Sequence, residues 1–124
     1  MSLVTPDDQI TLALTVTDRH ASAIWYEEKL GFKLRFHGDE MGWSEMSTNT
    51  PGVVLGFGEH TKPEPGNCVP VFGVSDLDAA RETLAAAGVN FDGETQVIDG
   101  MVKLATLYDP DNNALMLAER LSGR

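Results

Sequence analysis

Residues 10–32, ITLALTVTDRHASAIWYEEKLGF, decide the fold, because a shorter version of the same pattern returns at residues 69–89 as VPVFGVSDLDAARETLAAAGV. The first copy begins with leucine and valine alternating with threonine and alanine, which is typical of a strand with one buried face. An aspartate follows each strand, Asp18 or Asp76, whose carboxylate can accept bonds from the free N–H groups of a helix start. A glycine then marks the end of each helix. The pattern predicts two related modules in one chain.

The same reasoning predicts the remaining elements. Module 1 covers about residues 10–57 and module 2 about residues 69–118, with a linker at 58–68 that is rich in proline, glycine and charge. The linker is too short to separate independent domains, so residues 1–124 are predicted to form a single domain. The predicted strands are residues 10–17, 32–37, 43–47, 53–57, 69–74, 89–91, 102–108 and 114–118, and the predicted helices are residues 21–30 and 77–87.

Composition and charge exclude several classes of partner. No apolar run approaches the roughly 20 residues of a membrane span, and the first residues, MSLVTPDDQ, do not resemble a signal peptide. The single cysteine, Cys68, is compatible with a reducing cytoplasm, so we predict a cytoplasmic protein. The net charge of −10 argues against nucleic acid and anionic membranes as partners. It favours encounter with a cationic small molecule.

The motifs resemble those of one superfamily. The V-x-D and WYEEKLGF of the first module, the V-S-D of the second and the DPDNNALML at residues 109–117 are similar to those of the vicinal oxygen chelate superfamily. Its members include glyoxalase I, bleomycin-resistance proteins and extradiol dioxygenases, and the resemblance runs from about Ile10 to Ala118. It implies an α+β fold in which two βαβββ modules form a curved eight-stranded mixed sheet, with the helices outside and a concave cup inside. It also implies a homodimer.

Metal-dependent members of this superfamily place up to four His, Gln or Glu ligands on the cup face. Aligned by the V-x-D and DPD motifs, the corresponding positions are Thr11, about Leu55, Val69 and Met116. None offers the imidazole or carboxylate that a divalent ion prefers, so we predict no metal and no cofactor. His37 and Glu45 are candidate neighbours across a hairpin, but two ligands do not make a catalytic metal site. We interpret them as an exposed pair on an edge strand.

The predicted cup is apolar with a few polar groups. Arg35 and Trp43 would join it if the strands at 32–37 and 43–47 turn these residues inward, which the sequence leaves open. No catalytic residue is identified. The predicted ligand-binding residues are Thr11, Arg35, Trp43, Leu55, Val69 and Met116.

The favoured function is metal-independent binding of a cationic or aromatic small molecule, as in antibiotic sequestration by the bleomycin-resistance branch that the chain resembles. One alternative is a glyoxalase-type lyase or isomerase, or a dioxygenase, with a metal site that the alignment misses. Another is a metal-free enzyme in which Glu45, His37 and Arg35 perform acid–base chemistry on a small natural product. A desolvated Glu45 near His37 would favour that alternative.

Overall fold

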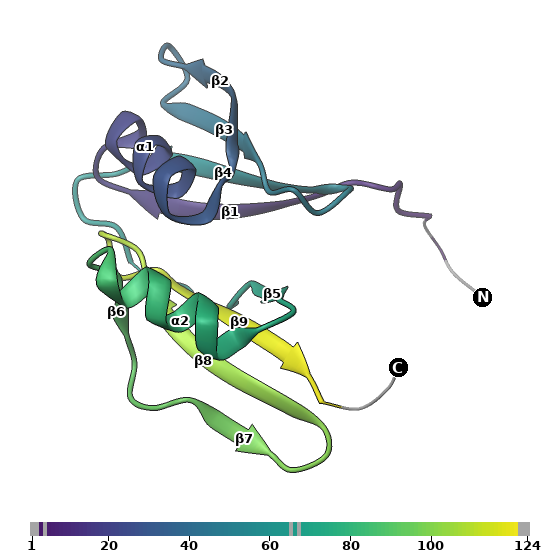
Figure 1. Ribbon diagram of the computed structural model, residues 1–124. Coiled ribbons are helices and arrows are strands. Elements are labelled where there is room, and N and C mark those ends of the chain that lie inside the picture. The colour runs from purple at the N-terminus through teal and green to yellow at the C-terminus, as the bar shows by residue number, and fades with distance from the viewer. Residues whose placement is uncertain (1–2, 4, 65, 67, 122–124) are drawn as a thin grey trace. The chain divides into compact units, whose positions relative to one another are not determined.

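The computed structural model describes residue 3, residues 5–64, residue 66 and residues 68–121 (Figure 1). The chain divides into two compact units, Met1–Thr61 and Lys62–Arg124. Within these described residues, each unit contains one helix and one mixed sheet, of four strands in the first unit and five in the second. The predicted α+β class is confirmed.

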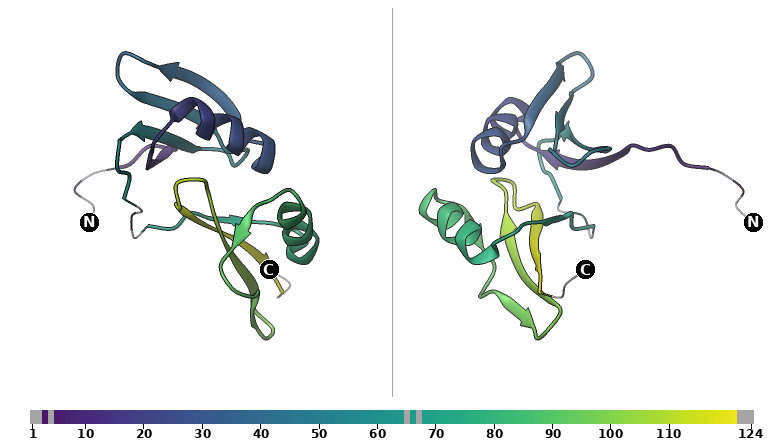
Figure 2. Two further views of the ribbon diagram at one scale, coloured as in Figure 1. Left: turned by 90° about the vertical axis from the view of Figure 1, so that its left-hand side faces the viewer. Right: turned by 45° about the vertical axis from the view of Figure 1, so that its right-hand side comes forward.

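The first unit contains α1 (Arg19–Leu30) and a sheet in the order β1-β4-β3-β2. β1 and β4 are parallel, and the other neighbours are antiparallel. The helix lies against one face of this sheet, as both views in Figure 2 show. The strands are β1 (Ile10–Val16), β2 (Lys33–Gly38), β3 (Trp43–Ser47) and β4 (Val53–Glu59).

Local chemistry fixes both ends of α1. The Asp18 carboxylate accepts bonds from the backbone N–H groups of His20 and Ala21, as predicted for a helix start. Gly31 ends the helix with φ at 72°, a conformation that glycine adopts without steric cost. The buried Tyr26 ring packs 5.1 Å from the ring of Phe57 in β4, so the helix covers the central strands.

Strand register assigns each side chain of the first sheet to one of two faces. Ser44 of β3 pairs with Phe57 of β4, and Phe57 contacts Tyr26 of α1, so Ser44, Phe57 and every second residue along their strands face the helix. The residues between them form the opposite face of the sheet, which we call the distal face. The distal face comprises Thr11, Ala13, Thr15, Lys33, Arg35, Phe36, Gly38, Trp43, Glu45, Ser47, Val54, Gly56 and Gly58.

The second unit contains α2 (Leu77–Ala86) and a sheet in the order β5-β9-β8-β6, with β7 pairing separately with β8. Asp76 caps α2, as predicted, and the Glu119 carboxylate also accepts a bond from the Leu77 N–H. Neither helix is long and apolar enough to cross a membrane, within the residues that the structure describes. The strands are β5 (Val71–Gly73), β6 (Asn90–Phe91), β7 (Gln96–Ile98), β8 (Val102–Tyr108) and β9 (Ala114–Arg120).

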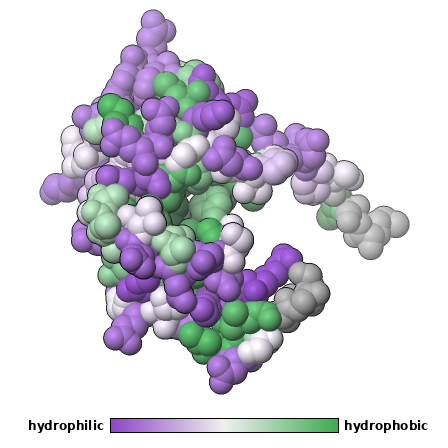
Figure 3. Space-filling view, in the orientation of Figure 1, coloured by the Kyte–Doolittle hydropathy of each residue, from purple (hydrophilic) through white to green (hydrophobic). Residues whose placement is uncertain are grey.

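The sequence did not predict β7. All three of its residues are exposed, so it lacks the buried side of the alternation that identifies a strand. Val97, Ile98 and the nearby Met101 are about half exposed, and apolar side chains gather over this hairpin in Figure 3. The edge of the second sheet therefore carries exposed apolar surface.

The DPDNN segment has a structural role. The buried Asp109 carboxylate accepts bonds from the backbone N–H groups of Asp111 and Asn113 and from the Asn113 side chain. Asn112 has φ at 65°, the left-handed conformation that asparagine tolerates better than most residues. The segment thus forms a tight turn that joins β8 to β9.

Candidate ligand-binding face

The indole of Trp43 lies over two glycines on the distal face. A Cβ atom added to Gly56 would lie 2.1 Å from Cζ2 and 2.4 Å from Cη2 of Trp43. A Cβ atom added to Gly58 would lie 3.9 Å from the same ring, an ordinary contact. Only a residue without Cβ at position 56 lets the indole rest directly on the strand. Trp43 is half-buried, so its ring also contributes to the surface of the distal face.

A carboxylate sits at the edge of this ring. The Trp43 indole N–H donates to Oε2 of Glu45 at 2.9 Å. Nε of Arg35 lies 4.0 Å from the other oxygen of Glu45, at the outer limit of an ion pair. The side chains of Arg35 and Glu45 are 40% and 20% exposed, so both can meet a ligand. The distal face thus combines an aromatic surface with the negative Glu45 and the positive Arg35 beside it.

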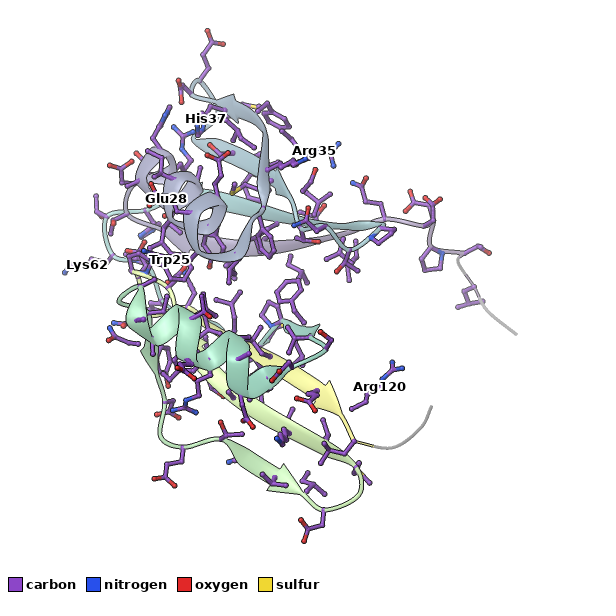
Figure 4. All side chains as sticks on the ribbon, viewed as in Figure 1. Trp25, Glu28, Arg35, His37, Lys62 and Arg120 are labelled. Carbon is purple, nitrogen blue, oxygen red and sulfur yellow. The ribbon has the colours of Figure 1, made fainter. Side chains whose placement is uncertain are left out.

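A β-bulge in β2 puts Arg35 and Phe36 on the same face. The pairing of β2 with β3 shifts between Leu34 and Phe36, so Arg35 and Phe36 both lie on the distal face while His37 pairs with Ser44 on the helix side. Figure 4 shows Arg35 and His37 pointing to different sides of β2. Strict alternation along β2 would put Arg35 and His37 on one face, and the bulge separates them.

An open pocket of about 310 Å³ adjoins the distal face. Arg35 is one of its walls, and Ser47 and Val54 belong to both the pocket and the face. Four of the other lining residues, 49–52, form the β3–β4 turn, and Gln9, Asn49 and Thr50 add polar groups that suit the polar part of a ligand. The lining residues are Gln9, Arg35, Ser47, Asn49, Thr50, Pro51, Gly52, Val53 and Val54.

Leu55 does not line the distal face, and this prediction is corrected. Leu55 pairs with Met46 on the helix side and has no exposed surface. The neighbouring Val54 takes the predicted position instead, opposite Thr11 in the parallel pair of β1 and β4. A one-residue slip in a strand exchanges its faces, which explains the error.

The residues at the superfamily's metal positions do not fit a divalent ion. In the first unit these positions are Thr11 and Val54, which offer one hydroxyl and no other donor. In the second unit Met116 lies on the sheet face opposite the buried Leu115 and Leu117, and its thioether is a soft ligand. Val69 is half-buried and precedes β5 rather than belonging to it.

Of the six predicted ligand-binding residues, the structure brings Thr11, Arg35 and Trp43 to one face of one sheet. Leu55 lies on the other face of that sheet. Val69 and Met116 belong to the second unit. The structure supplies the orientation of Arg35 and Trp43 that the sequence left open, whereas the binding role of these residues stays a prediction.

The prediction that His37 and Glu45 are neighbours across the hairpin is wrong, because the two side chains lie on opposite faces of the first sheet. His37 Nδ1 is 2.7 Å from Oγ of Ser44, and the His37 ring stacks on that of His20 with centroids 3.8 Å apart. Burial chiefly lowers the pKa of His37, and the nearby His20 lowers it further. The Asp39 carboxylate lies 2.9 Å from Nε2 of His20.

Arg19 and Asp39 form a charged cluster that the sequence did not predict. The buried Arg19 guanidinium donates to Ser44 Oγ at 2.8 Å and to Asp39 Oδ1 at 3.2 Å, and its Nε lies 3.2 Å from Glu59 Oε1. Hydrogen bonds from His20 and Arg19 lower the pKa of Asp39. These partners lie about 20 or more residues apart, a separation that leaves no periodic pattern in the sequence.

Comparisons with known proteins agree with this architecture. A family model described as the Glyoxalase/Bleomycin resistance protein/Dioxygenase superfamily matches residues 8–117. No curated protein matches the chain. A member of this superfamily from Sphaerobacter thermophilus DSM 20745 has a similar structure, with a TM-score of 0.77, 21% identity, and coverage of 90% of this chain and 96% of that chain.

Two further solved structures with the same fold have more specific names. TnmS3, an antibiotic binding protein from Streptomyces sp. CB03234, has a TM-score of 0.76 and 20% identity, and the match covers 97% of this chain and 99% of that chain. The fosfomycin resistance protein FosX from Listeria monocytogenes has a TM-score of 0.74 and 18% identity, with 94% of each chain covered. Identities this low show a common fold and leave the site to be judged from its own residues.

Proposed function

The chain belongs to the glyoxalase/bleomycin resistance protein/dioxygenase superfamily, and on this basis we propose that it is a metal-independent binding protein for an aromatic, positively charged small molecule. The observation that carries this proposal is the Trp43 indole resting on Gly56 with the Glu45 carboxylate at its edge. An aromatic ligand stacks on the indole, and its charge lies near the carboxylate.

The Trp43 ring supplies the first contribution to the binding free energy. Stacking of two aromatic groups contributes about 0.5–1.5 kcal/mol beyond the roughly 25 cal/mol per Å² from apolar burial. A cation over a tryptophan adds about 0.5–2 kcal/mol, depending on its desolvation. Association costs at least about 4 kcal/mol, so the ring alone does not give tight binding. The open pocket beside Arg35, with both polar and apolar walls, supplies the additional contacts that orient the ligand.

The charge of the site favours a cation. Glu45 has one oxygen bonded to the indole, and its ion-pair partner Arg35 is 4.0 Å away from the other. Because Arg35 is at this distance, it neutralises the carboxylate incompletely. The net charge of −10 adds a long-range attraction for cations at low ionic strength.

The proposal that binding is independent of metal rests on the side chains at the superfamily's metal-ligand positions. The positions that correspond to the superfamily's metal ligands hold Thr11, Val54, Val69 and Met116, and binding by stacking and charge needs no Lewis acid. The antibiotic-binding name of one structural neighbour supports antibiotic sequestration as the biological role. Acid–base catalysis by Glu45 with His37 is not supported, because these side chains lie on opposite faces of the sheet.

The experiment uses protein stripped of metal with EDTA and a Trp25→Phe background, in which Trp43 is the only tryptophan. Three two-ring probes are titrated: N-methylquinolinium, neutral 2-naphthol and anionic 2-naphthalenesulfonate. We expect saturable quenching of Trp43 fluorescence, strongest with the cation and unchanged by added Zn²⁺. Quenching that needs Zn²⁺, or no saturable quenching by any probe, would overturn the proposal.

A further inference from the structure

We propose that His20, His37 and Asp39 form a binding site for a divalent transition-metal ion such as Zn²⁺ or Ni²⁺, on the helix side of the first unit. One nitrogen from each histidine and one carboxylate oxygen lie within 4.8 Å of one another. In the part of the chain that the structure describes, no other group of three His, Cys, Asp or Glu side chains comes together in this way. The site is separate from the distal face, so each proposal can fail without the other.

The three ligands come from different elements. His20 lies in the first turn of α1, His37 lies in β2, and Asp39 follows β2 in the turn that leads to β3. Nε2 of His20 is already 2.9 Å from Oδ1 of Asp39, the spacing of two neighbouring ligands on one ion. Two imidazoles and one carboxylate form a donor set that suits Zn²⁺ and Ni²⁺ and leaves positions open for water.

Ser44 holds His37 in a state ready to bind a metal. Its hydroxyl lies 2.7 Å from Nδ1 of His37 and accepts a bond from the Arg19 guanidinium at 2.8 Å. Because Nδ1 is occupied by this contact, Nε2 of His37 is the nitrogen left for the ion. A partner on the second ring nitrogen is the usual way in which proteins orient a metal-binding histidine.

If Asp39 turns from Arg19 to a metal ion, the buried Arg19 guanidinium still has other partners. Arg19 keeps its bond to Ser44 Oγ and its contact with Glu59 at 3.2 Å when Asp39 turns to an ion. The side chain of Asp39 is 65% exposed and that of His20 is 53% exposed, so both are free to adjust. His20 has to turn, because the two rings are within 20° of parallel and imidazole lone pairs lie in the ring plane.

Acidic side chains partly offset the positive charges that lie near the proposed ion site. The positive end of the α1 dipole would repel a cation, but the Asp18 carboxylate already occupies that helix end. Glu59 offsets the charge of Arg19. A small adjoining pocket of about 120 Å³, which His20 and His37 help to line, leaves room for water ligands.

The test is calorimetric titration of EDTA-stripped protein without an affinity tag, using Zn²⁺ and Ni²⁺ alone, with Co²⁺ absorption as a spectroscopic readout. We expect one ion per chain, a rise in melting temperature with metal, and a visible Co²⁺ band. His20→Ala, His37→Ala and Asp39→Asn should each weaken binding roughly tenfold or more. Melting curves in EDTA show whether each variant is folded.

Two control variants match these changes. Glu40→Gln removes the same charge from the same turn, and His60→Ala removes the third histidine of the chain. Both should bind metal as the unchanged protein does. If Glu40→Gln and Asp39→Asn lose the same amount of metal affinity, the net negative charge of the turn, and not coordination by Asp39, governs binding. No binding to the unchanged protein, or undiminished binding to folded His20→Ala and His37→Ala, would overturn the proposal.

Discussion

The indole of Trp43 occupies the space above Gly56 that any Cβ atom would need, since a Cβ at that position would lie 2.1 Å from Cζ2 of the ring. The orientation of the indole therefore depends on a residue that carries no functional group. The two residues are on neighbouring strands of the distal face, where Glu45 of β3 pairs with Gly56 of β4.

Gly56→Ala should displace the Trp43 ring while the fold is retained, because a side chain can move where a backbone cannot. In the Trp25→Phe background the displaced indole loses its bond to Glu45, so we expect its fluorescence emission to shift to longer wavelength. Gly58→Ala is the matched control, since its Cβ would make only an ordinary 3.9 Å contact with the ring. Equal emission spectra for the two variants would contradict the described packing.

Arg35→Met should strengthen binding of the cationic probe N-methylquinolinium and weaken binding of 2-naphthalenesulfonate. Removal of the guanidinium frees Glu45 from its partner at 4.0 Å and takes away the positive group near an anion. Because both side chains are partly exposed, we expect changes of about 1 kcal/mol or less, roughly fivefold in Kd at most. Titrations at low and high salt measure the effect. If Arg35→Met changes the Kd of both probes in the same direction, the effect of Arg35 does not come from its charge.

Asp109→Ala should destabilise the second unit. The buried Asp109 carboxylate accepts three hydrogen bonds within the DPDNN turn, and its loss leaves those donors without their acceptor. A cost of about 1–3 kcal/mol in the free energy of unfolding is expected for one such group. Urea denaturation measures it, with the exposed Asp99→Ala as control. Equal midpoints for the two variants would show that the turn does not depend on Asp109.

Lys103 should give a pH-dependent contribution to stability at alkaline pH. Its hydrogen bond to Asp78 raises the pKa of Lys103 above the ordinary 10.5. Since the folded state holds the proton more tightly, this contribution is fully present below 10.5 and is lost as pH rises through the raised pKa. Asp78→Asn should therefore be less stable than the unchanged protein at neutral pH and equal to it well above 10.5. A difference that does not vary with pH would contradict this assignment.

Local patterns predicted most of the fold. The strands Trp43–Ser47 and Val102–Tyr108 have the predicted bounds, and Asp18 and Asp76 cap the two helices as expected. These features depend on residues close in sequence: apolar and polar residues that alternate along a strand, and aspartates that accept hydrogen bonds from the free N–H groups of a helix start.

The candidate site was harder to predict because it depends on which way each strand turns. Val54 to Phe57 of β4 are all buried, so this strand shows no alternation from which to assign Leu55 to a face. The bulge beside Arg35 interrupts the period of β2 without a sequence marker. The cluster of Arg19, His20 and Asp39 depends on contacts between separate elements.

The most direct test of the proposed function is the Kd of N-methylquinolinium, measured by calorimetry in EDTA for the unchanged protein, Gly56→Ala and Gly58→Ala. Both variants add one methyl group to the same strand, and only the first meets the Trp43 ring at 2.1 Å. If the indole is the binding surface, Gly56→Ala should weaken binding about tenfold or more, equivalent to 1.4 kcal/mol, whereas Gly58→Ala should bind nearly as the unchanged protein does. Equal affinities for all three proteins, or no binding to any of them, would contradict the proposal.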